Sequence, residues 1–174
     1  MQNYVVLVDK NDEELGLADK IEAHTTKPQL HRAITVLLFN DKNEILITKR
    51  SKGKLVWPLI WETTCSTHPF ENESYEECAK RRLKEELGID VTTKVVDKII
   101  YSSKDGDRGS ENEVCALLIG EINQSVSVNP AEIAETKFIV LDQLRKDVKK
   151  NPQEYASWLV LSLESLERLN ISKV

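Results

Sequence analysis

The best-marked element of this chain is one amphipathic helix, because the sequence specifies both of its ends as well as its buried face. Ser74 followed by Glu77 is a capping-box pair, and Gly88 is a natural helix terminator. Residues 75–87 between them place five apolar side chains on one face: Tyr75, Cys78, Ala79, Leu83 and Leu87. Such a helix covers a hydrophobic core, and the segments around it have strand patterns. The sequence therefore predicts an α/β fold of the α+β type, with helices packed on a sheet.

Strands are predicted on both sides of this helix. Apolar runs rich in β-branched residues occupy 4–9, 33–40, 44–50, 91–101, 112–122 and 136–141. Turns or loops are expected at 11–16, 40–43 and 102–110. Pro58 makes 55–64 a broken strand or a loop that leads into a site. A short charged helix is expected after residue 141, and an amphipathic helix at 154–169.

Length and composition favour one globular domain over residues 1–174, with 40% hydrophobic and 30% charged residues. A net charge of -5 and the lack of a nucleic-acid-binding motif argue against a nucleic-acid partner. Neither a secretory leader nor a membrane span is expected. Three cysteines (Cys65, Cys78 and Cys115) without C-x-x-C spacing favour a reducing cytoplasm over a disulfide framework. A monomer or weak homodimer is expected.

A metal site is the main functional hypothesis from residue types. The histidines are His24, His31 and His68, and Glu111 and Glu113 lie two apart in a predicted strand. Residues two apart on a strand share a face, so these carboxylates repel unless a cation or basic group separates them. Imidazoles and carboxylates together bind divalent ions such as Mn²⁺, Zn²⁺ or Mg²⁺. The alternatives are a solvated strand edge and hydrogen-bonded structural histidines. A metal site requires that all five side chains converge.

The predicted helix has a second pattern of charge. Arg81 and Glu85 are four residues apart, as are Arg82 and Glu86, so each pair can meet on the helix surface. One interpretation is ordinary helix-stabilising ion pairing. The other places Glu86 on the metal-binding side, with an arginine nearby to meet phosphate.

This spacing resembles the Nudix box, G-x5-E-x7-R-E-U-x-E-E-x-G-U, in which U is aliphatic. The matching positions here are Glu73, Arg81, Leu83, Glu85, Glu86, Gly88 and Ile89. Two positions depart from the pattern, because Thr67 replaces the first glycine and Arg82 replaces the first glutamate. Nudix hydrolases use that glutamate in their metal cluster, so its loss argues against pyrophosphohydrolase activity.

From about Tyr4 to the last helix, the chain resembles one branch of this superfamily, type 1 isopentenyl-diphosphate delta-isomerase. The matching segments are KIEAH, LHRA, TKRSKGK, CSTHP, RRLKEELG, ENEVC and the region of Trp158. The resemblance implies a single Nudix-type domain with a mixed β-sheet. It also implies that the chain moves a double bond, converting isopentenyl diphosphate to dimethylallyl diphosphate by protonation and deprotonation.

The resemblance also implies roles for individual residues. A divalent ion (Mn²⁺ or Zn²⁺) would be held by His24, His31, His68, Glu111 and Glu113, and Glu86 would help to bind Mg²⁺ and the diphosphate. The diphosphate would be contacted by Lys20, Arg50, Lys54 and Arg82. The hydrocarbon end would be lined by Tyr101 and Trp158, with Trp61 nearby. Glu113 would be the acid on one face of the alkene, assisted by Tyr101.

The opposite face of the alkene is where the chain departs from the family. The family has its second acid/base cysteine two residues before the metal-binding histidine, and here that residue is Ser66, with Cys65 one residue earlier. Three outcomes remain open: Ser66 acts slowly, Cys65 swings into the pocket, or the chain binds the diphosphate and turns it over poorly. Leu59 is a further departure, because relatives commonly have glycine after Pro58.

Two other functions are compatible with the sequence. One is a Nudix-type diphosphate hydrolase, against which Arg82 argues. The other is a non-catalytic prenyl-diphosphate-binding protein, which Ser66 keeps open.

Overall fold

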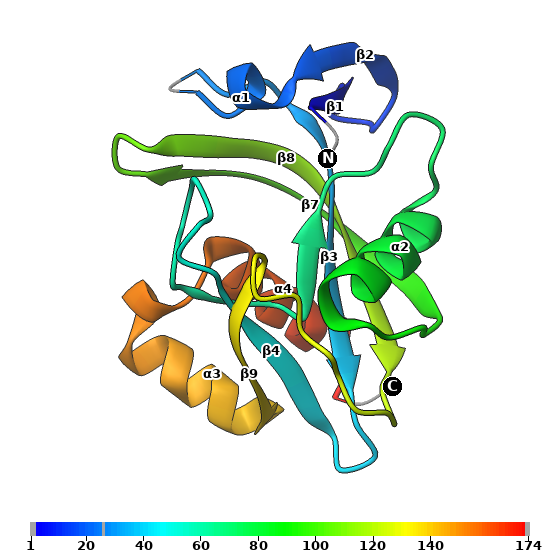
Figure 1. Cartoon of the computed structure of the whole chain (residues 1–174), viewed down its shortest axis with the longest axis vertical. Coiled ribbons are helices and arrows are strands. Elements are labelled where there is room, and N and C mark those ends of the chain that lie inside the picture. The colour runs from blue at the N-terminus through cyan, green and yellow to red at the C-terminus, as the bar shows by residue number, and fades with distance from the viewer. Residues whose placement is uncertain (1–2, 26, 173–174) are drawn as a thin grey trace.

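The computed structural model describes residues 3–25 and 27–172, which form one nine-stranded mixed sheet with helices around it (Figure 1). The strands are β1 (Tyr4–Val8), β2 (Glu14–Asp19), β3 (His31–Phe39), β4 (Glu44–Arg50), β5 (Trp61–Glu62), β6 (Cys65–Thr67), β7 (Thr93–Asp105), β8 (Gly109–Glu121) and β9 (Ile133–Val140). β3 is central, because it pairs in parallel with β8 and antiparallel with β1, β4 and β6. β7 pairs with β8, β9 pairs with β4, and β2 pairs with β1. The predicted fold class is confirmed.

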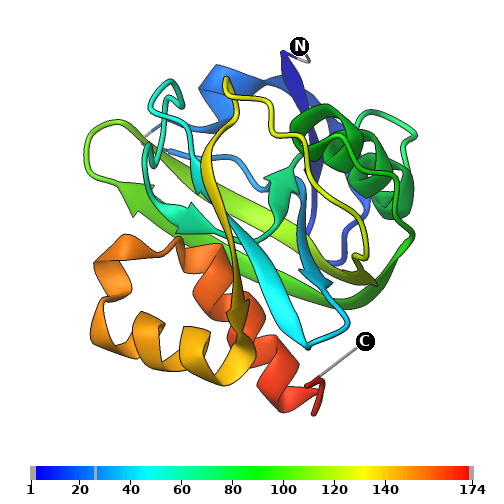
Figure 2. The ribbon, with the colours of Figure 1, turned by 60° about the horizontal axis from the view of Figure 1, so that its bottom comes forward.

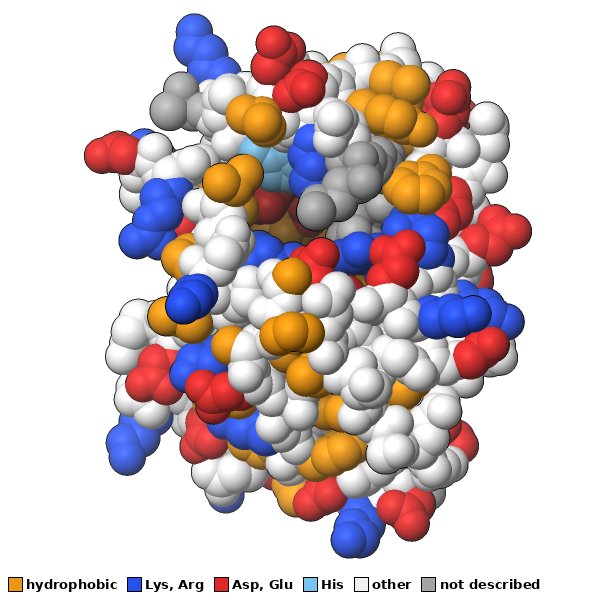
Figure 3. All heavy atoms as spheres, viewed as in Figure 1, with side chains coloured by type: hydrophobic (Ala, Val, Ile, Leu, Met, Phe, Trp, Pro, Cys, Tyr) orange, Lys and Arg blue, Asp and Glu red, His pale blue; other side chains and the backbone are white. Residues whose placement is uncertain are grey.

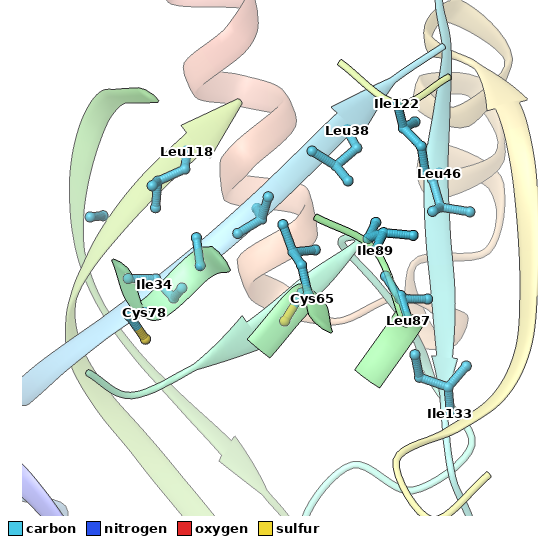
Figure 4. Close-up of a cluster of buried hydrophobic side chains, with 14 residues drawn as sticks. Ile34, Leu38, Leu46, Cys65, Cys78, Leu87, Ile89, Leu118, Ile122 and Ile133 are labelled. Carbon is cyan, nitrogen blue, oxygen red and sulfur yellow. The ribbon is translucent and has the colours of Figure 1, made fainter. Parts of the chain in front are cut away.

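Helices cover both faces of the sheet (Figure 2). They are α1 (Lys20–Ala23), α2 (Tyr75–Leu87), α3 (Leu141–Lys150) and α4 (Ser157–Arg168), with a 3-10 turn η1 (Pro152–Glu154) before α4. Alternate side chains of β3 point to opposite faces. Ile34 and Leu38 pack with Cys65 toward α2 (Figure 4), whereas Leu37 and Phe39 pack toward α3 and α4. The sheet therefore has a separate hydrophobic core on each face.

Helix α2 begins and ends at the predicted residues. The Ser74 hydroxyl accepts a hydrogen bond from Glu77 N (3.2 Å), and the Glu77 carboxylate accepts one from Ser74 N (2.9 Å). Gly88 ends the helix at φ 68°, a left-handed conformation in which glycine meets no steric penalty. Both predicted helix ends are confirmed.

The N-terminal segment differs from its predicted structure. The turn expected at 11–16 is shorter, because β2 begins at Glu14 and pairs with β1. The short helix α1 was not predicted, and its N-terminus is capped by the Asp19 carboxylate, which accepts hydrogen bonds from Ile21 N (2.8 Å) and Glu22 N (3.1 Å). β2 is largely exposed, so its sequence lacks the apolar alternation that identifies a half-buried strand.

The loop expected at 102–110 is mostly strand. β7 continues to Asp105 and β8 resumes at Gly109, with Ser103 opposite Glu111 in the ladder. Polar side chains are tolerated there because alternate residues of β7 are exposed. The long hairpin carries Glu111 into the interior of the molecule.

The segment between β4 and β5 has unusual backbone angles. Trp57 and Leu59 have φ values of 46° and 60°, which side chains with a Cβ rarely adopt. The left-handed conformation explains why glycine suits the position of Leu59. The predicted interruption by Pro58 is confirmed, since only Trp61–Glu62 of the apolar run is strand.

None of the described helices has both the length and the apolar composition that a membrane-spanning helix needs.

Candidate active site

All five residues of the predicted metal site converge. His24, His31, His68, Glu111 and Glu113 each offer one ligand atom, and these atoms lie within 4.8 Å of one another. Figure 3 shows a hollow with a histidine at its edge and charged side chains along its rim; every histidine of this chain belongs to the cluster. The convergence required by the metal hypothesis is therefore confirmed.

Strand register accounts for most of this arrangement. His31 on β3 lies opposite Glu113 on β8, and Glu113 lies opposite Tyr101 on β7. Tyr101 Oη donates a hydrogen bond to Glu113 Oε2 (2.6 Å). Glu111 lies two residues before Glu113 and is also buried, so it shares the same face.

His24 reaches the cluster from the end of α1. Its carbonyl oxygen accepts a hydrogen bond from Ser110 N (2.9 Å), which docks the segment on the start of β8. A Cβ at position 109 would lie 2.8 Å from that carbonyl oxygen, so this contact requires Gly109. The contact of the His24 backbone with Gly109 and Ser110 thus brings the end of α1 to the start of β8.

The side chains fit a metal ion in orientation. Nδ1 of His24 is bonded to the Lys20 carbonyl and Nδ1 of His31 to the Gln29 carbonyl (2.8 Å), which leaves each Nε2 lone pair for a ligand. His24 Nε2 and Glu111 Oε2 are close, 2.8 Å apart, but they do not form a hydrogen bond with each other. Neither atom has another hydrogen-bond partner among the described residues. Buried, unpaired donor atoms that face one point are what a divalent ion satisfies.

The local electrostatics also favour a cation. Burial lowers the pKa of His31, but the neighbouring carboxylates of Glu111 and Glu113 overcome this and raise it to about 10. Burial raises the pKa of Glu113, but His31 and His68 hold it well below its usual value. The two carboxylates thus stabilise positive charge at the centre of the cluster.

A cationic group of side chains lies beside the metal cluster. The pKa of Lys20 is lowered because surrounding protein displaces water and because the charges of Lys54 and Arg82 act on it. Arg82 pairs with Glu86 on α2, as predicted, and lies 3.4 Å from Glu132. Lys54 pairs with Glu132 as well. Three of the four residues predicted to contact diphosphate are therefore grouped around two acidic side chains.

Arg50, the fourth of these residues, is more enclosed. It donates hydrogen bonds to the carbonyls of Trp57 (3.0 Å) and Val56 (3.1 Å) and to Glu62 Oε1 (3.1 Å). Glu62 Oε2 accepts another from Trp158 Nε1 (3.1 Å). Arg50 is thus joined through Glu62 to the residue predicted to line the hydrocarbon end.

An aromatic cluster forms around Trp158. Trp57 meets Trp158 edge-on with ring centres 5.3 Å apart, and Tyr101 packs against the cluster that contains them. Trp61 lies elsewhere: it contacts Lys49 and Lys137, on the opposite side of β5 from Glu62. Its role in substrate binding stays a prediction.

Ser66 and Cys65 point to opposite faces of β6. Cys65 is fully buried in the core under α2, and burial raises the pKa of its thiol well above the usual value. Ser66 Oγ is hydrogen-bonded to the hydroxyls of Thr63 (2.8 Å) and Thr35 (3.1 Å). Among the described residues, Ser66 has no carboxylate or imidazole partner.

Three residues at the site were missed by the sequence analysis: Trp57, Glu62 and Glu132. One signal was present for Glu62, because it is a lone charge at the end of the apolar run LVWPLIW. Glu132 lies outside any predicted element, so no periodicity indicated its direction.

The fold and the site define a Nudix domain. The family model for the NUDIX domain matches residues 29–159. The DR0079 protein of Deinococcus radiodurans superposes with a TM-score of 0.73, at 17% identity, over 93% of this chain and 98% of its own. The MutT protein of Methanosarcina mazei superposes with a TM-score of 0.68, at 17% identity, over 81% of this chain and 95% of its own.

Within this superfamily, curated relatives narrow the assignment. Isopentenyl-diphosphate Delta-isomerase 2 of Aromatoleum aromaticum is 34% identical over 94% of this chain and 86% of its own length. The isopentenyl-diphosphate Delta-isomerase of Salmonella arizonae is 32% identical over 92% of this chain and 89% of its own length. The chain belongs to the type 1 isopentenyl-diphosphate delta-isomerase family, which confirms the predicted resemblance.

Proposed function

We propose that this chain converts isopentenyl diphosphate to dimethylallyl diphosphate. The observation that supports this most is the hydrogen bond between Tyr101 and Glu113 inside the His/Glu cluster, which fixes the position of a buried carboxylate. The cationic group of Lys20, Lys54 and Arg82 lies on one side of the site.

The site has a cationic end, which suits the diphosphate of such a substrate, and an aromatic end, which suits its hydrocarbon part. Lys20, Lys54 and Arg82 can give charge-assisted hydrogen bonds to the diphosphate, with Arg50 as a further donor. Glu86 and the diphosphate oxygens suit Mg²⁺, and the His/Glu cluster suits Mn²⁺ or Zn²⁺. These ions supply charge neutralisation of the diphosphate and of the clustered carboxylates.

Protonation of the alkene creates a tertiary carbocation at the hydrocarbon end. We assign the first proton transfer to Glu113, which would take up a proton from solvent and give it to the alkene. Tyr101 holds the Glu113 carboxyl group in place through its hydrogen bond. The indole face of Trp158 would stabilise the cation by ~1–2 kcal/mol in a desolvated site. Enclosure by Trp57 and Tyr101 keeps water from the cation.

The second proton transfer is expected to be slow. A serine hydroxyl exchanges protons poorly unless a base activates it, and the partners of Ser66 are the hydroxyls of Thr35 and Thr63. This observation favours a second candidate function, which is binding of prenyl diphosphates without turnover.

The proposed setting is a cytoplasmic monomer or weak homodimer acting on a small prenyl diphosphate. Three buried cysteines that form no disulfide fit a reducing compartment.

Incubation of the pure protein with isopentenyl diphosphate, Mg²⁺ and Mn²⁺ in D₂O tests the proposal. The expected result is dimethylallyl diphosphate containing deuterium, because the added proton comes from exchangeable groups. Binding without deuterated product would support the binding protein instead. Released phosphate would support a Nudix hydrolase.

A further inference from the structure

Glu62 is a buried carboxylate to which the proposed reaction gives no role. It is 5% exposed, and it accepts one hydrogen bond from Trp158 Nε1 and one from Arg50 Nη1, each 3.1 Å long. Burial of a carboxylate is unfavourable unless its partners compensate for the lost hydration. Here one carboxylate accepts hydrogen bonds from both Arg50, which is expected to contact the diphosphate, and Trp158, which is expected to contact the hydrocarbon end of the substrate.

Arg50 places a fixed positive charge near the Trp158 ring. Its guanidinium carbon lies 5.5 Å from the ring centre, and two backbone carbonyls, those of Trp57 and Val56, hold it in place. A carbocation next to the same ring would be repelled by this charge, because the site is shielded from water and the effective dielectric constant is low. The stabilisation by the indole face would then be offset.

The position of Glu62 removes this conflict. Its Oε1 lies against Arg50 and its Oε2 against the Trp158 N–H, so one negative charge lies between the guanidinium and the indole. The same two contacts fix the orientation of the ring, which Trp57 also meets edge-on at 5.3 Å.

We propose that Glu62 is a positioning residue that neutralises Arg50 and holds the Trp158 ring, so that the hydrocarbon end of the site accepts a cation. This inference rests on the proposed function, since a carbocation forms only if the chain isomerises its substrate. The property it assigns to the site, a preference for a cationic tail, is measurable without turnover.

Two ligands of nearly equal shape measure this preference. In 2-(dimethylamino)ethyl diphosphate a protonated nitrogen occupies the place where the cation would form, and 3-methylbutyl diphosphate has a neutral carbon there. Their dissociation constants are measured by calorimetry with Mg²⁺ and Mn²⁺ present. The ratio of the two constants reports the tail end alone, because the diphosphate is common to both.

Glu62→Gln removes the charge but keeps an oxygen that can accept from Trp158. The expected result is a loss of about 10- to 100-fold in affinity for the cationic ligand, with less than about a threefold change for the neutral one. The double variant Glu62→Gln/Arg50→Gln lacks both the carboxylate charge and the guanidinium charge that it neutralises. The ratio of the two dissociation constants is therefore expected to return close to that of the wild type. This double variant also avoids an unpaired buried arginine, so it tests the idea if the single variant folds poorly.

Glu135→Gln is the matched control, because Glu135 pairs with Lys49 (2.8 Å) at an exposed position and its loss should leave the ratio unchanged. An unchanged ratio in Glu62→Gln, or a double variant that keeps the altered ratio, would overturn the inference. A wild type that prefers the cationic ligand through Glu62 but forms no deuterated product would overturn the isomerase function alone. A wild type that isomerises with a ratio independent of Glu62 would overturn this inference alone.

Discussion

Two adjacent residues of β6, Cys65 and Ser66, lie in different environments. Cys65 fills the core beneath α2, while Ser66 presents its hydroxyl to those of Thr35 and Thr63. For the Cys65 thiol to reach the other face, β6 would have to shift by one residue, which reverses the direction of every side chain in it. This geometry supports the proposal that Ser66, and not Cys65, occupies the second acid/base position.

Ser66→Cys is expected to raise isomerase turnover by about 10- to 100-fold, because a thiol with a pKa near ~8.5 exchanges protons readily at neutral pH. Initial rates of deuterium incorporation from D₂O provide the measurement. The control is Cys65→Ala, which should alter stability more than rate. A lower rate in Ser66→Cys, together with loss of activity in Cys65→Ala, would show that the assignment of Ser66 is wrong.

Residue types made a metal cluster one of several hypotheses, and the family resemblance named its ligands. The shared strand face of Glu111 and Glu113 was predicted from their spacing, whereas their convergence with the histidines depends on tertiary structure. The role of Glu62 was not predicted, because Pro58 interrupts the strand alternation that would show which face of the sheet the Glu62 side chain is on. Glu132 meets Lys54 only through tertiary structure, which local pattern does not contain.

At the scale of elements, helix α2 is where local sequence and tertiary structure agree most closely. Its cap, its stop and its buried face were all predicted, and Arg82 and Glu86 pair along it. β2 and α1 were missed because short exposed elements have weak patterns. The parallel pairing of β3 with β8 was also beyond local sequence, because these strands are far apart in the chain.

Ser74→Ala is expected to lower the free energy of unfolding by about 1 kcal/mol, because the backbone N–H of Glu77 loses its acceptor at the start of α2. Urea denaturation followed by circular dichroism measures this change. Ser74→Asp keeps an acceptor at the same place and should restore most of the stability. Equal stability of the alanine variant and the wild type would mean that the capping box contributes nothing.

At the scale of the whole molecule, the site gathers side chains from segments that are far apart in the sequence. His24 follows α1, His31 begins β3, His68 follows β6, and Glu111 and Glu113 lie on β8. An ion bound by all of them would link these segments in the folded state only. Metal binding should therefore contribute to global stability.

Removal of divalent ions by a chelator is expected to lower the melting temperature. A free ion concentration of about 100 times the dissociation constant stabilises by ~2.7 kcal/mol, which corresponds to roughly 5–10 °C for a chain of this size. Thermal unfolding with and without Mn²⁺ or Zn²⁺ gives the shift. In Glu111→Gln the shift should shrink, whereas Glu135→Gln should behave as the wild type. Equal shifts in all three proteins would place the ion elsewhere.

The docking of His24 on Gly109 and Ser110 has a practical consequence for domain boundaries. The region matched by the NUDIX family model begins at residue 29, after Lys20 and His24. A truncated protein cut at that boundary would still contain β3, β8 and α2, and so most of both cores. It would nevertheless lack one imidazole of the cluster and one lysine of the cationic group. A fragment that begins where the family model begins therefore lacks two residues of the proposed site. Its inactivity would reflect the missing residues and would say nothing about the activity of the whole chain.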